Sequence, residues 1–317
     1  EKNSDVEFDF DNDPIQPWID GDWVKAKGTT LGADNGIGMA MGFALMKSTD
    51  IPHPPLEVLC TLDEETGLTG AMQLGTDLLK ADILINLDSE EDGALYIGCA
   101  GGQTTFVKFV SKPSDVPANT IAMEIKVKGL KGGHSGLDIH TGRGNAIKIV
   151  ARLLHTLTYK FGIRLVSLIG GSKHNAIPRE SFAVIRVAKK MVGDVYSFIN
   201  EFNKIVKTEF ASVEPTLEVS AEEIKSRAKV MDKTTANNLI DSMYAVPNGV
   251  VKMSADIEGL VQTSTNLAVV TTKGKTVEII LSQRSSSETE KKDISNSVAA
   301  LFRLAKAEVK QGDGYPG

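Results

Sequence analysis

Residues 120–128 read TIAMEIKVK, a run in which apolar and polar side chains alternate. This period of two is typical of a strand that buries one face and exposes the other, as strands of antiparallel sheets do. Further strands are predicted near residues 164–169, 181–188, 249–253, 264–272 and 275–283. Helical patterns separate them at about 142–159, 191–210, 232–245 and 287–310. The pattern predicts an antiparallel sheet with helices on one face.

The first third of the chain has a different pattern. Residues 55–62 (PLEVLCTL) and 81–87 (ADILINL) are short, continuous apolar runs, which predict buried strands. Helices are predicted at 34–47, with Asp34 as the N-cap, and at 67–79. Alternation of helices with buried strands indicates a mainly parallel sheet with helices on its faces.

Length and composition narrow the class of protein. The chain has 317 residues, which at about 150 residues per domain indicates two domains, and we place their boundary at the glycine cluster near residue 101. Lys and Arg number 35 against 41 Asp and Glu, so 35 − 41 gives a net charge of −6, unlike the basic surface of a nucleic-acid binder. The longest nearly apolar run, residues 37–46, is far shorter than the roughly 18 residues that suggest a membrane span. We therefore expect neither a nucleic acid nor a membrane as partner.

The two cysteines, Cys60 and Cys99, lie in apolar stretches. They are too few for a disulfide framework or a CxxC zinc ribbon. We expect both to be buried, reduced thiols of a cytosolic protein.

Acidic residues follow both predicted strands of the first third. Residues 63–65 (DEE) come after the first strand, Asp88 comes after the second, and Asp34 lies in a glycine-rich loop. Ligands of open parallel sheets bind outside the carboxyl ends of the strands, so these carboxylates are expected to share one edge. Carboxylates crowded together repel one another unless a cation neutralises them. The sequence therefore predicts a pair of divalent ions, with one carboxylate bridging them.

Each of these elements also has a simpler structural interpretation. Asp34 can be the N-cap of its helix, residues 63–65 a solvated turn, and residues 88–92 (DSEED) an acidic loop. The glycines at 36–42 also approach a dinucleotide-binding fingerprint, but their spacing is GxGxxxG, which is one residue too long. No apolar strand precedes them, and Asp34 would oppose a pyrophosphate at the helix N-terminus, so the pattern disfavours a nucleotide site.

Four strings in this order resemble a known family. They are TTLGADNGIG (29–38), KGGHSG (131–136), HNAIPRE (174–180) and AVPNGV (245–250). The first looks like the bridging-aspartate segment of the dinuclear zinc exopeptidases related to aminoacylase and glutamate carboxypeptidase. Together the strings most resemble the bacterial aminoacyl-histidine dipeptidases, which also cleave carnosine (β-alanyl-histidine). The resemblance runs through nearly the whole chain.

The resemblance implies two zinc ions per subunit, with Mn²⁺ or Co²⁺ as substitutes. Asp34 would bridge the ions, Asp88 would complete one site and Glu65 the other. Glu64 would be the general base that takes a proton from the attacking water.

In the second domain, the resemblance makes His134 an oxyanion-stabilising residue, which is delivered to the active site of the partner subunit in a homodimer. Asn175 and Arg284 would hold the free carboxylate of a dipeptide substrate, a role that suits the bidentate fork of arginine. Without the resemblance, His134 would pass for an exposed loop histidine and Arg284 for a surface charge.

The sequence departs from the family pattern at its ends. The family's first zinc ligand, a histidine in a His-x-Asp motif, and its last histidine ligand have no counterpart here, and both ends look like cuts through a longer chain. We therefore expect a partial metal-binding catalytic domain at 1–100, a lid and dimerisation domain at 101–313, and the start of a return to the catalytic domain at 314–317. The implied fold class is α/β: a zinc-exopeptidase domain with a mainly parallel sheet, plus an inserted α+β lid domain.

The sequence thus predicts a cytoplasmic, metal-dependent dipeptidase that prefers a C-terminal histidine. One alternative is a broader di- or tripeptidase, or an N-acyl amino acid deacylase, of the same family. Another is a non-catalytic peptide-binding or dimerising relative. The missing histidines favour this last alternative, whereas Asp34, Glu64, Glu65 and Asp88 disfavour it, because a binding protein needs no general base.

Overall fold

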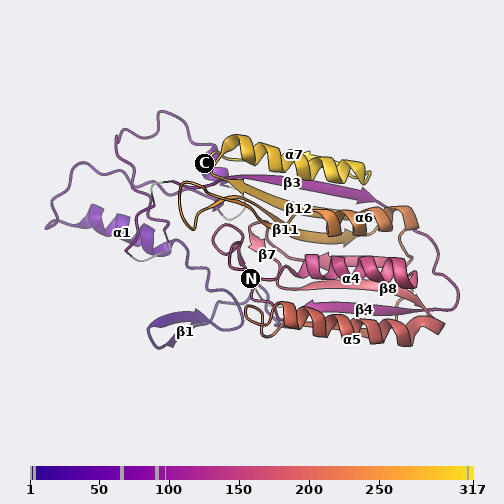
Figure 1. Ribbon diagram of the computed structural model, residues 1–317. Helices are drawn as coiled ribbons and strands as arrows, with labels where there is room; N and C mark the ends of the chain where they lie inside the picture. The colour runs from indigo at the N-terminus through magenta and orange to yellow at the C-terminus, as the bar shows by residue number, and fades with distance from the viewer. Residues whose placement is uncertain (1, 3–4, 65–67, 90–92, 97, 313) are drawn as a thin grey trace. The chain divides into compact units, whose positions relative to one another are not determined.

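The computed structural model divides the chain into two compact units, Glu1–Ile97 and Gly98–Gly317 (Figure 1). The structure describes residues 2, 5–64, 68–89, 93–96, 98–312 and 314–317. No helix among these residues is long and apolar enough to cross a membrane.

The first unit contains little regular structure. Strands β1 (Pro17–Asp20) and β2 (Trp23–Ala26) form an antiparallel hairpin. Helix α1 (Gly36–Lys47) confirms the helix predicted at 34–47, and α3 (Thr69–Met72) is a single turn within the predicted helix 67–79.

The prediction of two strands in this unit is wrong. Residues 55–62 and 81–87 have no strand pairing, and Ile83, Leu84 and Ile85 are 81%, 79% and 76% exposed. A buried parallel strand needs a hydrogen-bonded neighbour on at least one side, and the described residues of this unit supply none. For the same reason the apolar run around Cys60 is not packed. Cys60 and Cys99 are both exposed free thiols, so the prediction that they are buried is also wrong.

The second unit is built on one antiparallel sheet (Figure 1). Its order is β13-β3-β12-β11-β6-β8-β4-β9, with β10 paired to β11. The strands are β3 (Gly101–Val110), β4 (Thr120–Lys128), β6 (Arg164–Gly170), β8 (Ser181–Ala188), β9 (Glu218–Ile224), β10 (Gly249–Met253), β11 (Val261–Lys273), β12 (Thr276–Ser285) and β13 (Glu308–Gln311). A separate short ladder joins β5 (Gly133–His134) to β7 (Ala176–Ile177). The antiparallel sheet predicted from the alternating patterns is confirmed.

Four long helices cover one face of this sheet, as predicted (Figure 1). They are α4 (Ala146–Phe161), α5 (Val192–Glu209), α6 (Lys233–Ala245) and α7 (Glu288–Leu304). Met123, Ile125 and Val127, the alternate apolar residues of β4, are fully buried in the core beneath the helices. Burying such a side chain stabilises the fold by about 1.5–3 kcal/mol, so the period of two in residues 120–128 fixes which face of the strand turns inward.

The sequence patterns missed three strands of the large sheet. β3 and β9 were not predicted, and the helix predicted at 287–310 ends at Leu304, after which β13 pairs with β3. Lys306 has a φ of 63°, which lies in the left-handed region and cannot continue a right-handed helix.

A buried amide joins the helices to the centre of the sheet. The Asn145 side chain is the N-cap of α4, because its Oδ1 accepts from the backbone N–H groups of Ile147 and Lys148 at 3.0 and 3.1 Å. Its Nδ2 donates to the Leu267 carbonyl of β11 at 2.9 Å and to the side chain of Asn248 at 3.0 Å.

Asn266, the neighbour of Leu267 on β11, extends this network to a second segment. Its Oδ1 accepts from Asn145 Nδ2 at 3.3 Å, and its own Nδ2 donates to the Ala176 carbonyl of β7 at 2.8 Å. The network therefore reaches the short ladder that carries His134, which pairs with Ala176.

We expect Asn145→Ala to lower the free energy of unfolding by about 2–4 kcal/mol, because it removes a helix cap and leaves buried amide and carbonyl groups without partners. Urea denaturation followed by circular dichroism measures this. Asn200→Ala is the matched control, since Asn200 is exposed on α5 and its loss should change the stability by less than about 0.5 kcal/mol. Equal effects of the two substitutions would contradict the assigned role.

Candidate functional site

Asn35 organises the glycine-rich loop of the first unit. Its Oδ1 accepts from the backbone N–H of Gly38 at 2.9 Å, so Asn35, and not Asp34, is the N-cap of α1. Its Nδ2 donates to the Leu87 carbonyl at 2.7 Å, across 52 positions of sequence. Asn35 thus fastens the loop to the residue that precedes Asp88, and the capping role suggested for Asp34 is wrong.

Asp34 and Asp88 lie against each other as a result. Partial desolvation, and then the charge of the neighbouring Asp34 carboxylate, raise the pKa of Asp88, while a hydrogen bond with Asn35 opposes the shift. Both carboxylates are exposed to solvent. Two adjacent oxygen-donor groups that repel each other and are open to solvent suit a divalent cation, which would relieve the repulsion.

The remaining acidic candidates are described only in part. Asp63 has a φ of 56°, and the Gly70 N–H donates to the Leu62 carbonyl at 2.9 Å. Glu64 is the last described residue before a gap, and Glu65 lies outside the described residues. Within the part of the chain that is described, no group of three or more His, Cys, Asp or Glu side chains is arranged to hold a metal ion. Of the predicted ligands, the structure brings together Asp34 and Asp88.

In the second unit, a tight turn fixes the ring of His134. The backbone N–H of His134 donates to Asp138 Oδ2 at 2.9 Å, and the His134 carbonyl accepts from the Asp138 N–H at 2.8 Å. The N–H of Leu137 donates to His134 Nδ1 at 3.2 Å, so the neutral ring carries its proton on Nε2. Gly133 is required here: at its φ of 137°, a Cβ would lie 2.2 Å from Arg143 Nη1.

Burial, and then the positive charge of Arg284, lower the pKa of His134, and His174 lowers it further, while Asp138 opposes the shift. The ring is therefore neutral at physiological pH and is a hydrogen-bond donor through Nε2. His134 is half-buried, so the interpretation as an exposed loop histidine is wrong.

Arg284 on β12 lies next to His134. A Cβ built on Gly136 would be 3.1 Å from His134 Cε1 and 3.3 Å from Arg284 Nη1, so the two side chains meet at this glycine. Arg284 is half-buried, and its Nε is buried without a hydrogen-bond partner, unlike the surface charge suggested by its position at a strand end. Asn175 adjoins the same turn through its carbonyl, which accepts from the Ser135 N–H at 2.7 Å. The structure thus brings together His134, Asn175 and Arg284.

Tyr315 supports Arg284 and was not predicted. Its hydroxyl accepts from Arg284 Nη1 at 3.0 Å. Its ring lies over Gly102, where a Cβ would be 2.6 Å from the ring carbons, so only glycine admits the phenol at this place. In the sequence, the Gly101–Gly102 pair indicates only a domain boundary and gives no signal for the tyrosine.

Glu214 is a second residue that sequence reasoning missed. It is 1% exposed, and its two carboxylate oxygens accept from the backbone N–H groups of Lys131 (2.8 Å) and Gly144 (3.0 Å). These two residues bracket the segment that carries His134. Within the segment, Arg143 donates to the Gly132 carbonyl at 2.6 Å and pairs with Asp138 at 2.8 Å. No sequence motif identifies Glu214, because it is far in sequence from its partners, Lys131 and Gly144.

Comparison with known proteins gives one family match, two related sequences and one related solved structure. Residues 125–214 match the family model described as a peptidase dimerisation domain. The chain is 43% identical over its 317 residues to the cytosol non-specific dipeptidase of Escherichia coli (strain K12). This match covers 100% of the chain and 65% of the relative. Over 80 residues (24% of the chain and 22% of the relative) it is 36% identical to the uncharacterized protein YqjE of Bacillus subtilis (strain 168).

A solved structure, the aminoacylhistidine dipeptidase of Vibrio alginolyticus, has a TM-score of 0.75 and 43% identity to this chain. The match covers 100% of this chain and 65% of that one, so the chain spans about two thirds of the length of these two dipeptidases. At this identity and score the two share a fold, and the α/β fold class expected from the sequence is confirmed.

We expect Glu214→Gln to loosen the segment between Lys131 and Gly144, because the amide offers one acceptor where the carboxylate offered two. A hydrogen bond to a charged group contributes about 1.5–3 kcal/mol, so exchange of the two amide protons should accelerate by about tenfold or more. Hydrogen exchange followed by NMR measures this. Glu218→Gln, at an exposed position of β9, is the control and should leave both rates unchanged. Unchanged protection in Glu214→Gln would show that the carboxylate does not hold the segment.

Proposed function

Since the chain has the fold of the M20 peptidases, with their dimerisation domain at residues 125–214, we propose that it acts in a metal-dependent dipeptidase. The observation that carries the proposal is the contact between Asp34 and Asp88, two carboxylates from distant segments that Asn35 draws together. The proposal is also supported by similarity over the whole chain to two proteins that are named dipeptidases.

In this proposal Asp34 would be a ligand shared by two divalent ions, preferably zinc, with Asp88 as a further ligand of one ion and Glu65 of the other. Bound zinc would supply Lewis acidity, which polarises a carbonyl and lowers the pKa of water. Glu64, next to the ligand Glu65, takes the proton from the attacking water and passes it to the leaving amine. Two carboxylates in contact supply part of the donor set that such ions need, whereas a peptide-binding relative without metal has no use for them.

His134 and Arg284 contact different groups of the substrate. The neutral ring of His134 donates from Nε2 to the oxyanion that forms on the peptide carbonyl. Arg284, held by Tyr315, and Asn175 bind the free carboxylate of the dipeptide, so that only a chain end fits. We place His134 in the active site of the partner subunit of a homodimer formed through the lid, at 101–313, as the dimerisation domain supports.

The preferred substrate carries a C-terminal histidine, as the name of the Vibrio enzyme suggests for that protein. The name of the Escherichia coli relative favours a broad dipeptidase as the second candidate, and a cytoplasmic location for this protein. A panel of Xaa-His and Xaa-nonHis dipeptides, offered to the full-length protein loaded with zinc, separates the two. A full-length protein that binds no metal and hydrolyses none of them would support the non-catalytic alternative.

In the full-length enzyme, Glu64→Gln should keep about two zinc ions per subunit and slow hydrolysis by roughly 10²–10⁴-fold, the loss expected for a general base. Glu65→Gln should instead lower the zinc content, because a neutral amide is a weaker ligand. Zinc analysis and turnover of a Xaa-His dipeptide measure both effects. If Glu64→Gln loses the zinc and Glu65→Gln retains it, the two assignments are exchanged.

The position of His134 predicts complementation between subunits. When full-length Glu64→Gln and His134→Ala proteins are refolded together in equal amounts, about half of the dimers are mixed. If His134 serves the partner's site, each mixed dimer has one site with both lesions and one intact site, so about a quarter of all sites recover. Activity no higher than the mean of the two parents, with subunit exchange verified by mass spectrometry, would place His134 in its own subunit's site.

A further inference from the structure

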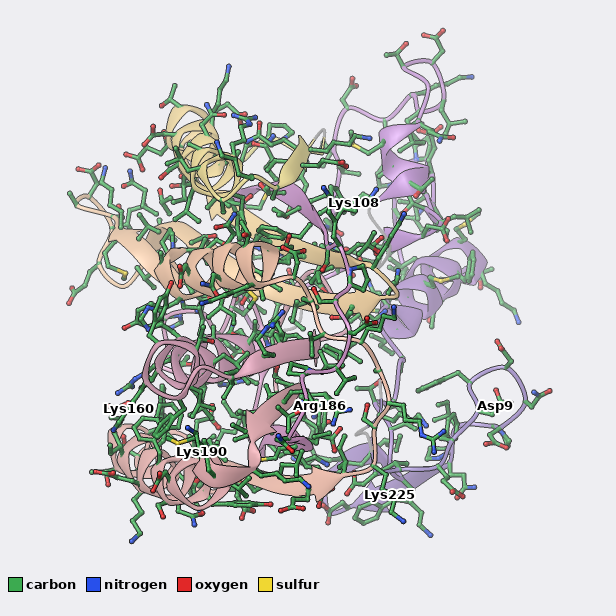
Figure 2. The ribbon with its side chains drawn as sticks, turned by 90° about the vertical axis from the view of Figure 1, so that its right-hand side faces the viewer. Asp9, Lys108, Lys160, Arg186, Lys190 and Lys225 are labelled. Carbon is green, nitrogen blue, oxygen red and sulfur yellow. The ribbon has the colours of Figure 1, made fainter. Side chains whose placement is uncertain are left out.

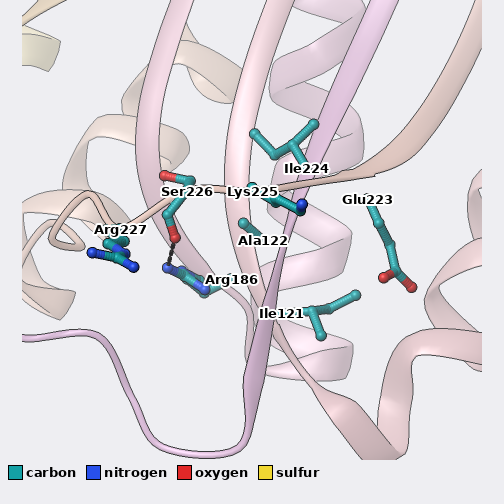
Figure 3. Close-up of a pocket in the computed structure, with 8 residues that line it drawn as sticks. All are labelled: Ile121, Ala122, Arg186, Glu223, Ile224, Lys225, Ser226 and Arg227. Carbon is teal, nitrogen blue, oxygen red and sulfur yellow. Dashed lines mark hydrogen bonds between the residues drawn. The ribbon is translucent and has the colours of Figure 1, made fainter.

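An open pocket of about 600 Å³ lies at the end of the sheet where β8 and β9 finish (Figure 3). It is separate from the turn that carries His134. The chain runs from β7 into β8, which begins at Ser181, and Arg186 of the pocket lies 186 − 181 = 5 positions further along this strand. At about 3.3 Å per residue, Arg186 is roughly 17 Å from the start of β8.

Arg186 is the buried cation of this pocket. Its side chain lies on the face of β8 opposite the helices, since the core residues Ile185 and Val187 flank it, and it is 7% exposed. One Nη donates to the Ser226 carbonyl, drawn as a dashed line in Figure 3, and the Nε is buried without a partner. A buried guanidinium with an unsatisfied N–H donor carries a desolvation cost, which a bound acceptor would offset.

A second arginine increases the positive charge at this place. Arg164 of β6 lies directly opposite Arg186 in the antiparallel register. Arg164 donates to the Met231 carbonyl at 2.9 Å, and its Nε is also buried without a partner. Like charges directly opposite each other on a sheet destabilise it. Among the described residues, neither arginine forms an ion pair with a carboxylate that would offset this cost.

The segment after β9 adds cations that solvent can reach. Lys225 and Arg227 line the pocket and are exposed, and Glu223 is the acidic residue of its lining. Figure 3 shows Arg227 beside Arg186 and Glu223 on the opposite side of Lys225. Three cations, Arg186, Lys225 and Arg227, against one carboxylate give 3 − 1 = +2 for the lining. Ile224 adds an apolar side chain on the same face as Arg186, because both lie directly opposite Ala122 of β4.

We propose that this pocket binds a phosphate group, held by Arg186, Arg227 and Lys225. A phosphate monoester carries about −1.5 to −2 charges at pH 7, which matches the lining, and its oxygens accept from the arginine fork. The ligand is free phosphate or a small organic phosphate whose carbon chain contacts Ile224. This inference concerns a region of the sheet that the proposed peptidase reaction does not use, and it stands independently of that reaction.

Titration calorimetry of the whole protein with inorganic phosphate, at low ionic strength, tests the proposal. We expect saturable binding that Arg227→Gln and Lys225→Gln each weaken by about tenfold, as for the loss of one charge-assisted hydrogen bond. Lys190→Gln is the matched control, because Lys190, labelled with Arg186 and Lys225 in Figure 2, is an exposed cation of the 3-10 turn η1 (Lys189–Met191) outside the pocket. It should leave the affinity within about a factor of two.

A second titration, with butyl phosphate, distinguishes an organic phosphate ligand from free phosphate. Tighter binding of butyl phosphate than of inorganic phosphate identifies an organic phosphate, whose chain reaches Ile224. Equal or weaker binding of butyl phosphate identifies phosphate itself. Because Lys225 and Arg227 are exposed, their variants should keep the thermal midpoint of the protein, which is measured in parallel. No saturable binding of either ligand at up to about 20 mM, or equal weakening in Lys190→Gln, would overturn the proposal.

Discussion

The buried side chain of Asn145 connects elements of the second unit that are distant in sequence. Its oxygen caps α4, and its nitrogen reaches the backbone of β11 and the amides of Asn248 and Asn266. Asn266 carries the connection to Ala176, and Ala176 pairs with His134. A buried amide is stable only when all its donors and acceptors are used, so helix, sheet and turn must keep one mutual arrangement. The geometry around His134 therefore depends on a residue that does not touch it.

Sequence patterns predicted the second unit well because its elements are governed by local periodicity. The alternation in β4 and the capping residue of α4 act over one strand or one turn of helix, and both can be recognised without knowing their partners. β9 was missed because its residues, EVSAEEI, are mostly polar and lie at the edge of the sheet. In the first unit, the apolar runs at 55–62 and 81–87 have the composition of strands, but composition cannot supply the neighbouring strand that pairing requires.

The candidate site was predictable to the extent that its residues lie in distinctive strings. Asp34 and Asp88 do meet, His134 and Arg284 meet at Gly136, and Asn175 adjoins the same turn through its carbonyl. The residues that hold them could not be found in this way. Glu214 and Tyr315 act over long separations, through a backbone N–H or a single hydroxyl, and such contacts place no requirement on neighbouring residues in the sequence. The resemblance predicts roles for certain residues, whereas the structure shows which other residues hold them in place.

The attachment of both ends of one segment to a single carboxylate has a mechanical consequence. Because Lys131 and Gly144 are bound to the two oxygens of Glu214, the chain between them is closed like a cyclic peptide, in the size range of an Ω-loop of about 6–16 residues. Closing such a loop costs on the order of 2 kcal/mol of chain entropy once, during folding. The ring of His134 is held from within this loop, by the Leu137 N–H at Nδ1 and by the contact of the His134 N–H with Asp138. The nitrogen that carries the proton is thus set inside the closed loop and not by the strands and helices outside it.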